Sequence, residues 1–142
     1  MTFLFSCRHT TRVLERWENG TVKLERIYLD KYSYVENSYH ENGQLWAKTR
    51  YKNGRRNGKY VAYYDNGQKL GEVTYINDTV NGKCVEYFPN GNTMFEGQQI
   101  MGKLNGVIKR YDKNGRIKIE EVYLKGTVTS FHEWDSSGNQ LK

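Results

Sequence analysis

Apolar and polar residues alternate along the chain in short runs that turn-forming residues separate. Alternation with a period of two is typical of β-strands, and no apolar run keeps a helical period for the length that a stable helix needs. Some runs lead into an Asn-Gly pair and others lead away from one. The former are residues 59–64, 83–88 and 107–111, and the latter are residues 44–51, 68–76, 92–100 and 116–124. The pattern predicts an all-β protein.

The turns between these runs recur at a fixed interval. A glycine preceded by Asn or Ser returns every 23 or 24 residues, at Gly20, Gly43, Gly67, Gly91, Gly115 and Gly138. An aromatic residue stands four positions before most of these turn glycines, at Tyr39, Tyr63, Tyr87, Tyr111 and Trp134. A second glycine follows fifteen residues after the first, at Gly58, Gly82 and Gly106. Such a period indicates a tandem array of one structural unit.

Each unit is predicted to contain two strands and two connections. We expect a type I′ turn at each Asn-Gly pair, because both central residues of that turn need positive φ and these two residues tolerate it. The second connections, at residues 52–57, 77–81 and 101–105, are expected to be open loops that the second glycine closes. Stacked units would form an elongated, twisted, single-layer antiparallel sheet of tandem β-hairpins of about 24 residues.

The array is predicted to span residues 16–142, with units starting near 16, 39, 63, 87 and 111 and a partial unit from 134. Arg16 and Val35 replace the usual aromatic residue and second glycine in the first unit. The terminal units are therefore interpreted as caps for the sheet edges. Residues 1–15 lie outside the pattern and could add a covering strand or remain loose. At 142 residues and 37% hydrophobic content, the chain suits one domain without a large central core.

The recurring aromatic residue, Asn-Gly pair, alternating strand ending in Tyr and later Gly resemble the variant MORN repeats of bacterial and large-DNA-virus proteins. The resemblance covers about five units. Many bacterial proteins of this kind are described as YwqK-like antitoxins, which are thought to neutralise a toxin by binding it. Related arrays are described as scaffolds or as binders of acidic lipid. The resemblance thus implies a MORN-type fold and a non-catalytic binding role, possible in several forms.

The excess positive charge of the chain is local. The chain has 22 Lys and Arg residues against 16 Asp and Glu residues, and residues 48–59 hold six of the basic residues and no acid. The window is either a solvated loop or a docking patch for an acidic protein, an acidic membrane surface or nucleic acid. Nucleic acid is disfavoured, because the same tyrosines recur in units that lack the basic residues.

If the window binds a protein, aromatic and Arg anchors should dominate the interface. The candidate partner-binding residues are Trp46, Lys48, Arg50, Tyr51, Lys52, Arg55, Arg56, Lys59 and Tyr60. Substitution of Arg55 and Arg56 by Glu is predicted to abolish capture of an acidic partner without lowering the melting temperature.

No catalytic or metal-binding motif stands out, so we expect no enzyme activity, no metal and no cofactor. His132 falls at a strand position, and Cys84 aligns with Tyr60 and Ile108, which favours a packed thiol. Four glutamates share one position, five residues after the turn glycine, and Lys48 interrupts the row. We interpret the row of Glu25, Glu72, Glu96 and Glu120 as outward residues paired with bases such as Lys118 or Arg110.

Two cysteines give no disulfide framework, which fits a reducing compartment. The stretch from Leu4 to Cys7 resembles a lipoprotein cleavage box, but its apolar run is too short for a signal peptide, and no run is long enough to span a bilayer. We therefore expect an intracellular, cytoplasmic protein that binds another protein with an acidic surface, with an antitoxin or immunity role as its most concrete form. The alternatives are an architectural scaffold that self-associates through its edge strands, and a binder of acidic lipid.

Overall fold

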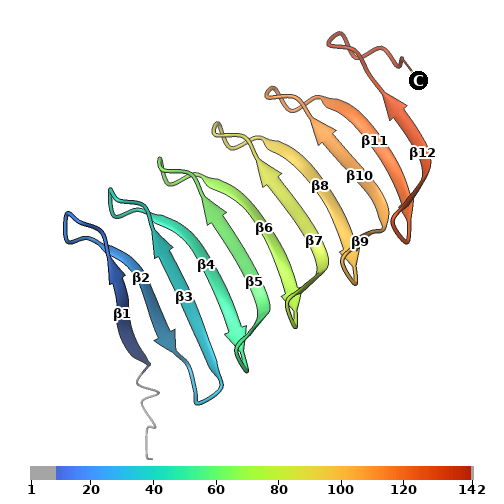
Figure 1. Cartoon of the computed structure of the whole chain (residues 1–142). Coiled ribbons are helices and arrows are strands. Elements are labelled where there is room, and N and C mark those ends of the chain that lie inside the picture. Colours follow the sequence, from blue (N-terminus) through green and yellow to red (C-terminus); the bar gives the residue numbers. More distant parts are fainter. Residues whose placement is uncertain (1–8, 142) are drawn as a thin grey trace, which may run out of the picture.

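The computed structural model describes residues 9–141, and these fold into a single antiparallel β-sheet (Figure 1). Twelve strands follow one another along the chain. The strands are β1 (Thr10–Arg16), β2 (Val22–Tyr28), β3 (Ser33–Tyr39), β4 (Leu45–Lys52), β5 (Arg55–Tyr63), β6 (Lys69–Ile76), β7 (Thr79–Tyr87), β8 (Thr93–Ile100), β9 (Lys103–Leu104), β10 (Gly106–Tyr111), β11 (Ile117–Leu124) and β12 (Thr127–Glu133). The predicted all-β, single-layer fold of tandem hairpins is confirmed.

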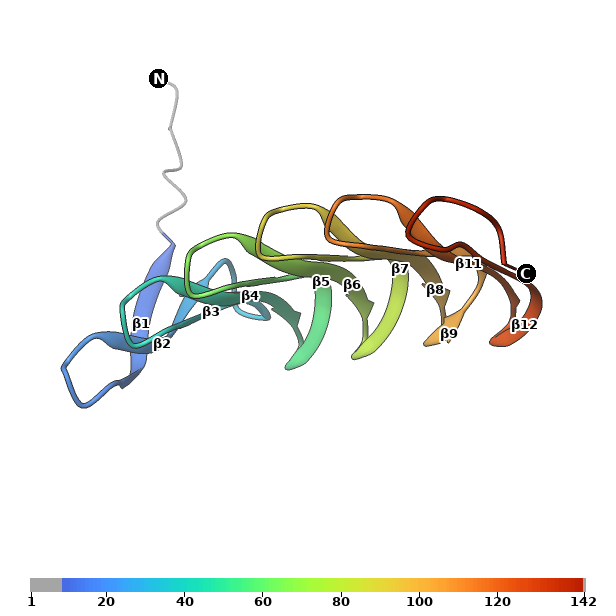
Figure 2. The same ribbon diagram turned by 90° about the horizontal axis from the view of Figure 1, so that it is seen from above.

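Strands that are consecutive in sequence are neighbours in space, apart from the short β9, which pairs only with the end of β8. Figure 2 shows the hairpins displaced one after another in a single direction, each bent along its length. Strand β1 forms one edge of the sheet and pairs with β2, although most of its residues precede the repeating pattern. The cleavage-box-like stretch from Leu4 to Cys7 lies outside the described residues.

The prediction of type I′ turns at the Asn-Gly pairs is wrong. At Gly43 the amide donates to the His40 carbonyl at 2.9 Å, and the His40 amide donates to the Gln44 carbonyl at 2.8 Å. Gly43 has a φ of +83°, whereas Asn42 is not among the residues with positive φ. This geometry is a type I turn followed by a glycine in the left-handed region, which forms a bulge at the strand end.

The asparagine of the turn forms hydrogen bonds through its side chain. Asn42 accepts the Gln44 amide at its Oδ1 (2.9 Å) and donates from Nδ2 to the Asp65 carbonyl in the next turn (3.1 Å). Asn19 and Asn90 likewise donate to a carbonyl of the following turn, at 3.1 and 2.9 Å. In these three turns the asparagine therefore ties adjacent units together at this end of the sheet.

True two-residue turns with two positive φ angles lie at the opposite end of the hairpins. Asn53 and Gly54 have φ of +51° and +75°, and Asn77 and Asp78 have φ of +48° and +68°. The predicted open loops at residues 52–57 and 77–81 are therefore wrong. Two of the second glycines do not close a loop, since Gly58 lies within β5 and Gly82 lies within β7. Gly58 has a φ of +121° and lies where the register of β5 against β4 shifts. A bulge in the strand accommodates the residues that the prediction had placed in a loop.

The side chains alternate between two faces, and only a few of them are buried. One face, which we call the charged face, carries the register row Lys48, Val61, Glu72, Val85 and Glu96. The other, which we call the packed face, carries the buried Ala47, Thr49, Ala62, Cys84 and Ile108. Burial raises the pKa of the Cys84 thiol. The predictions of a packed thiol and of a thin core are confirmed.

Candidate functional site

Strand β4 presents three exposed cations on the charged face. Lys48, Arg50 and Lys52 are exposed and alternate with the buried Thr49 and the half-buried Tyr51. A straight strand places every second side chain on the same side, so these three cations follow one another along the face. Trp46 is also exposed, but it lies at a bulge in the pairing of β4 with β3 and does not continue the line.

The predicted site residues do not all share this face. Tyr51 lies on the packed face and stacks on Tyr34, with ring centroids 4.8 Å apart and an interplanar angle of 11°. The rings of Tyr60 and Tyr75 meet edge to face, with their centroids 6.3 Å apart. Burial raises the pKa of both Tyr51 and Tyr60. The structure therefore places these two rings in packing contacts, away from the line of exposed cations.

Arg56 is also held by internal contacts. Its Nε lies 3.1 Å from Asp78 Oδ1, and its guanidinium carbon lies 4.1 Å from the centroid of the Tyr75 ring. The hydrogen bond that Arg56 donates to the Asp78 carboxylate raises the pKa of Arg56. Arg55, by contrast, is exposed and stands opposite Lys52 in the register. The two neighbouring arginines thus differ, since one is part of the fold and the other extends into solvent.

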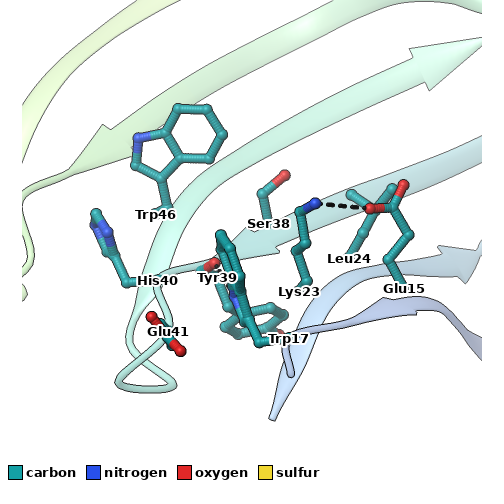
Figure 3. Close-up of a pocket in the computed structure, with 9 residues that line it drawn as sticks. All are labelled: Glu15, Trp17, Lys23, Leu24, Ser38, Tyr39, His40, Glu41 and Trp46. Atoms are coloured by element: carbon teal, nitrogen blue, oxygen red, sulfur yellow. Dashed lines mark hydrogen bonds and ion pairs between the residues drawn. The ribbon is translucent and has the colours of Figure 1, made fainter. Parts of the chain in front are cut away.

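A hollow of about 460 Å³ lies beside Trp46, and its lining includes Leu24 and Ser38, which stand in register with the buried Ala47 of the packed face (Figure 3). Trp17, Tyr39 and His40 line it together with Trp46. The Trp17 Nε1 donates to the Tyr39 carbonyl at 3.1 Å, and the Lys23 Nζ lies 5.0 Å from the centroid of the Trp17 ring. The hollow is therefore largely aromatic. Trp17 and Tyr39 were not among the predicted site residues, because they come from other hairpins.

Two other hollows lie on the charged face of β4 and share Arg50 and Gly58. One, of about 590 Å³, is lined by Lys48, Arg50 and Lys59 together with apolar side chains that include Val35 of β3 and Val61 of β5. The next, of about 680 Å³, is lined by Arg50, Lys52 and the loop around Lys31. We call these two hollows together the β4 trough. The first has three cations and no carboxylate in its lining, whereas Asp30 lines the second.

Gly58 makes room for the cation at the centre of the trough. A Cβ at this position would lie 3.0 Å from Arg50 Cδ and 3.2 Å from Arg50 Cβ. The aliphatic stem of Arg50 therefore lies directly against the backbone of β5 at the bulge. Because only glycine has no Cβ, this close approach and the φ of +121° both explain the residue.

Within residues 9–141, the side chains of Lys48 and Arg50 make no hydrogen bond and no ion pair. Lys59, at the side of the trough, contacts Glu72 at 3.2 Å, and Glu72 also accepts Lys69 at 3.0 Å. The hydrogen bond from Lys69, followed by that from Lys59, lowers the pKa of Glu72. The trough therefore contains two cations without an internal counter-ion.

The other units place a glutamate where β4 has Lys48. The glutamates pair with lysines of the preceding strand: Glu72 with Lys59, Glu96 with Lys83 at 3.8 Å, and Glu120 with Lys109 at 3.5 Å. The prediction that Lys118 or Arg110 supplies the partner for this row is wrong, since Arg110 bonds to Glu121 instead. The strand register explains which residue pairs with Glu120. Lys109 stands directly opposite Glu120, whereas Arg110 stands opposite Ile119.

Residues 9–141 contain no group of three or more His, Cys, Asp and Glu side chains that could hold a metal ion. The same part of the chain has no helix with the length and apolar character that crossing a membrane requires.

Comparison with known proteins gives a family match over three segments of the chain. The model of the MORN repeat variant matches residues 35–53, 56–77 and 104–125. No curated protein matches the chain. A solved structure, accessory secretory protein 1, 2 and 3 of Streptococcus pneumoniae, matches at 19% identity with a TM-score of 0.40, covering 80% of this chain and 21% of that one. The chain is therefore similar to MORN repeat variant proteins over these three segments, and its sheet of hairpins is consistent with that repeat.

Proposed function

We propose that this protein is a non-catalytic binding module that captures an acidic protein partner on the β4 trough. The support comes from charge and exposure. Lys48 and Arg50 are exposed, lie side by side on one face and lack an internal counter-ion. Since unpaired cations on a rigid face attract a surface of opposite charge, they supply both steering and specificity for an acidic partner.

One observation carries the proposal, namely the contrast between β4 and its equivalents. Five, seven and nine residues after the turn glycine, β4 has Lys48, Arg50 and Lys52, all basic. The same three positions are Glu, Thr and Ile on β6, Glu, Gln and Ile on β8, and Glu, Val and Leu on β11. Because the backbone repeats while these side chains do not, packing of the repeat does not account for the basic residues on β4.

The proposal is tested by capture of partners from the native source, followed by reconstitution with the purified partner. We expect the Lys48→Glu/Arg50→Glu variant to lose the partner. Lys113→Glu/Lys125→Glu, which makes the same change in net charge at two exposed positions far along the array, should retain it. Binding should also weaken as salt is raised, because exposed charges are screened. A partner that binds both variants equally would refute the proposal.

A second candidate is the binding of an anionic membrane surface. It is favoured by the exposed Trp46 on the same strand as the cations, since Trp and basic residues together bind the interfacial region of acidic bilayers. Flotation with vesicles of phosphatidylcholine, with and without phosphatidylserine, tests this candidate. Binding only to the acidic vesicles, lost in Lys48→Glu/Arg50→Glu, would replace the protein partner by a lipid surface.

We include two finer elements in the proposal. The first is neutralisation of the partner by binding, as described for YwqK-like antitoxins, which a toxin gene beside this one and rescue of the toxin's effect would support. The second is a location in the cytoplasm, in keeping with the buried free thiol of Cys84. An assembly role remains the alternative, and it is supported by β1, whose residues are all exposed at an edge of the sheet.

A further inference from the structure

The aromatic hollow beside Trp46 opens on the packed face and shares no lining residue with the β4 trough. We propose that it is a second binding site, which holds the quaternary ammonium group of a small molecule of the choline class. The inference goes beyond the proposed function, because it concerns another face and another class of ligand. It rests on the rings that line the hollow, on an ammonium group already bound there, and on a carboxylate that lacks a partner.

Four rings line the hollow, and two of them are held by the following unit. The rings belong to Trp17, Tyr39, His40 and Trp46. The Trp17 Nε1 donates to the Tyr39 carbonyl at 3.1 Å, and the His40 Nε2 lies 3.3 Å from the Tyr63 carbonyl. The tilted rings of His40 and Trp46 have their centroids 6.5 Å apart. The aromatic wall is therefore preformed, and the electron-rich face of such a ring attracts cations.

One side of the hollow already holds an ammonium group of the protein itself. The Lys23 Nζ lies 5.0 Å from the centroid of the Trp17 ring and 3.1 Å from Glu15 Oε2. The cation is thus shared between a ring and a carboxylate, an arrangement in which the ring quadrupole and the ion pair both favour the positive charge. The contact shows which kind of group this hollow attracts.

The other side of the hollow has the ring and the carboxylate but lacks the cation. Figure 3 shows Trp46 and Glu41 on one side of Tyr39, and Lys23 and Glu15 on the other. In the described part of the chain no lysine or arginine stacks on Trp46, which is 50% exposed. The Glu41 carboxylate makes no hydrogen bond or ion pair with residues 9–141. An incoming cation would contact the ring of Trp46 and have its charge balanced by Glu41.

The lining favours a quaternary ammonium group over a primary one. A primary ammonium needs hydrogen-bond acceptors in place of the water that it loses, as Lys23 finds in Glu15. A trimethylammonium group has no N–H to satisfy, and its methyl groups contact ring faces directly. The hollow of about 460 Å³ is in the range of small-ligand sites, so it admits this group with the short chain that carries it. An anion is disfavoured, because two glutamates and one lysine line the hollow.

The hollow is built by the first two repeats, and the sequence does not repeat it. Trp46 stands three residues after its turn glycine, and no other unit has a ring at that position. The equivalent residues are Lys23, Leu70, Met94 and Lys118. We therefore expect one ligand to bind per molecule despite the repeated backbone.

The test is a titration of the full chain with choline chloride at constant ionic strength, followed by NMR of the indole N–H signals of the three tryptophans. Trp17 and Trp46 line the hollow, whereas Trp134 lies in the last unit and is the internal reference. We expect saturable shifts of the first two signals and none of the third, with a dissociation constant of about 1–10 mM. The uncharged isostere of choline, in which carbon replaces the quaternary nitrogen, should bind about tenfold more weakly.

Two variants with matched controls identify the groups that bind choline. Trp46→Leu introduces the residue that the equivalent position of β6 carries, and the affinity for choline should fall about tenfold. Glu41→Gln should also weaken choline binding, whereas Asp65→Asn, which makes the same change in charge at the equivalent position of the next turn, should not. Lys48→Glu/Arg50→Glu, on the other face, should leave choline binding unchanged. Thermal unfolding shows whether each variant folds, and the titration of the unmodified protein decides the case independently of any variant.

The inference is overturned if choline shifts neither signal of the hollow below about 100 mM. It is also overturned if the uncharged isostere binds as tightly as choline, because the hollow would then be a general apolar site. A peptide with trimethylated lysine that binds where choline does not would replace the small molecule by a protein side chain, against the inference. Because Lys48→Glu/Arg50→Glu tests the trough alone, failure of the proposed function is distinguishable from failure of this inference.

Discussion

The hydroxyl of Tyr111 in β10 donates a hydrogen bond to Glu96 Oε1 in β8 at 2.5 Å. Tyr39 in β3 makes the same bond to Glu25 in β2, also at 2.5 Å. In both cases the recurring tyrosine of one unit binds the recurring glutamate of the unit before it. Each of these two pairs therefore joins adjacent units across the charged face, whereas the equivalent Glu72 accepts Lys59 and Lys69 instead.

Loss of the tie should lower stability. Tyr111→Phe removes the hydroxyl while keeping the ring, so the half-buried carboxylate of Glu96 loses one donor. We expect the free energy of unfolding to fall by about 1–2 kcal/mol, since a bond to a charged acceptor exceeds an ordinary one. Urea denaturation measures it. Tyr32→Phe, at a loop ring that is 59% exposed, is the control and should change little. Equal effects would refute the tie.

The tyrosines of the ties should make stability depend on alkaline pH. Burial, followed by the hydrogen bond to glutamate, raises the pKa of Tyr39 and Tyr111 to about 12, whereas an unfolded tyrosine ionises near pH 10. The folded state thus keeps its protons longer, so this contribution is complete below about pH 10 and is lost as pH rises toward 12. The free energy of unfolding, measured with urea at a series of pH values, should therefore fall less steeply with rising pH in Tyr39→Phe/Tyr111→Phe than in the unmodified protein. If the free energy of unfolding falls with pH as steeply in Tyr39→Phe/Tyr111→Phe as in Tyr32→Phe, the pH dependence does not come from Tyr39 and Tyr111.

Neighbouring arginines should respond differently to charge reversal. Arg56→Glu brings a carboxylate to Asp78 and removes the contact with the Tyr75 ring, which alone is worth about 0.5–1 kcal/mol. We therefore expect a lower melting temperature. Arg55→Glu, at an exposed position, should leave it unchanged. Calorimetry of the two single variants decides the question. Single variants are needed because a double reversal of Arg55 and Arg56 could lose a partner either through the changed charge or through lower stability.

The sequence was sufficient for the repeat, the hairpins and the single sheet, since turn glycines and alternation report these directly. It was insufficient for the turn types. Asn42 was interpreted through its backbone, whereas its side chain bonds to the next unit. Positive φ at Asp78 was not predicted either, because acidic residues adopt it less often than Asn or Gly.

The candidate site was predicted only in part, for a geometric reason. A window along the chain collects residues from both faces, so Tyr51 and Lys52 were grouped although they point in opposite directions. Strand parity alone would have separated them. No window would have joined Trp17 to Trp46, because two strands, β2 and β3, intervene and only the pairing of neighbouring hairpins brings them to one hollow. Which side chains lie on which face of the sheet depends on the strand register, and the bulges change that register.

On the packed face, the side chain of Ile108 lies close against Gly97. Ile108 is fully buried, and a Cβ at Gly97 would lie 2.4 Å from its Cδ1. Gly97→Ala should therefore lower the free energy of unfolding by about 1–3 kcal/mol through overpacking. Ile108→Val, which removes the Cδ1 atom, should cost about 0.5–1.5 kcal/mol by itself.

The double variant tests the contact itself. Because the Val side chain ends before the clash, Gly97→Ala should cost less in the Ile108→Val background than in the unmodified protein. A double-mutant cycle from urea denaturation gives the coupling directly. Strict additivity would mean that the added methyl group disturbs something other than Ile108.

A stabilising substitution is expected at Met101. This residue begins the two-residue turn with Gly102 at a φ of +52°, and its side chain is 75% exposed. Asn53 and Asn77 hold the same turn position in other units with φ of +51° and +48°. Left-handed backbone is strained for most side chains but tolerated by asparagine, and Met101 has no packing contact that would compensate.

Met101→Asn should therefore raise the free energy of unfolding by about 0.5 kcal/mol, which urea denaturation can resolve. The Met101 amide bond to Asn81 Oδ1, at 3.1 Å, involves only the backbone and is retained. Met101→Gln is the matched control, because glutamine is as polar as asparagine but lacks its tolerance of positive φ. An equal gain in the two variants would show that removal of an exposed apolar side chain, rather than relief of backbone strain, stabilises the protein.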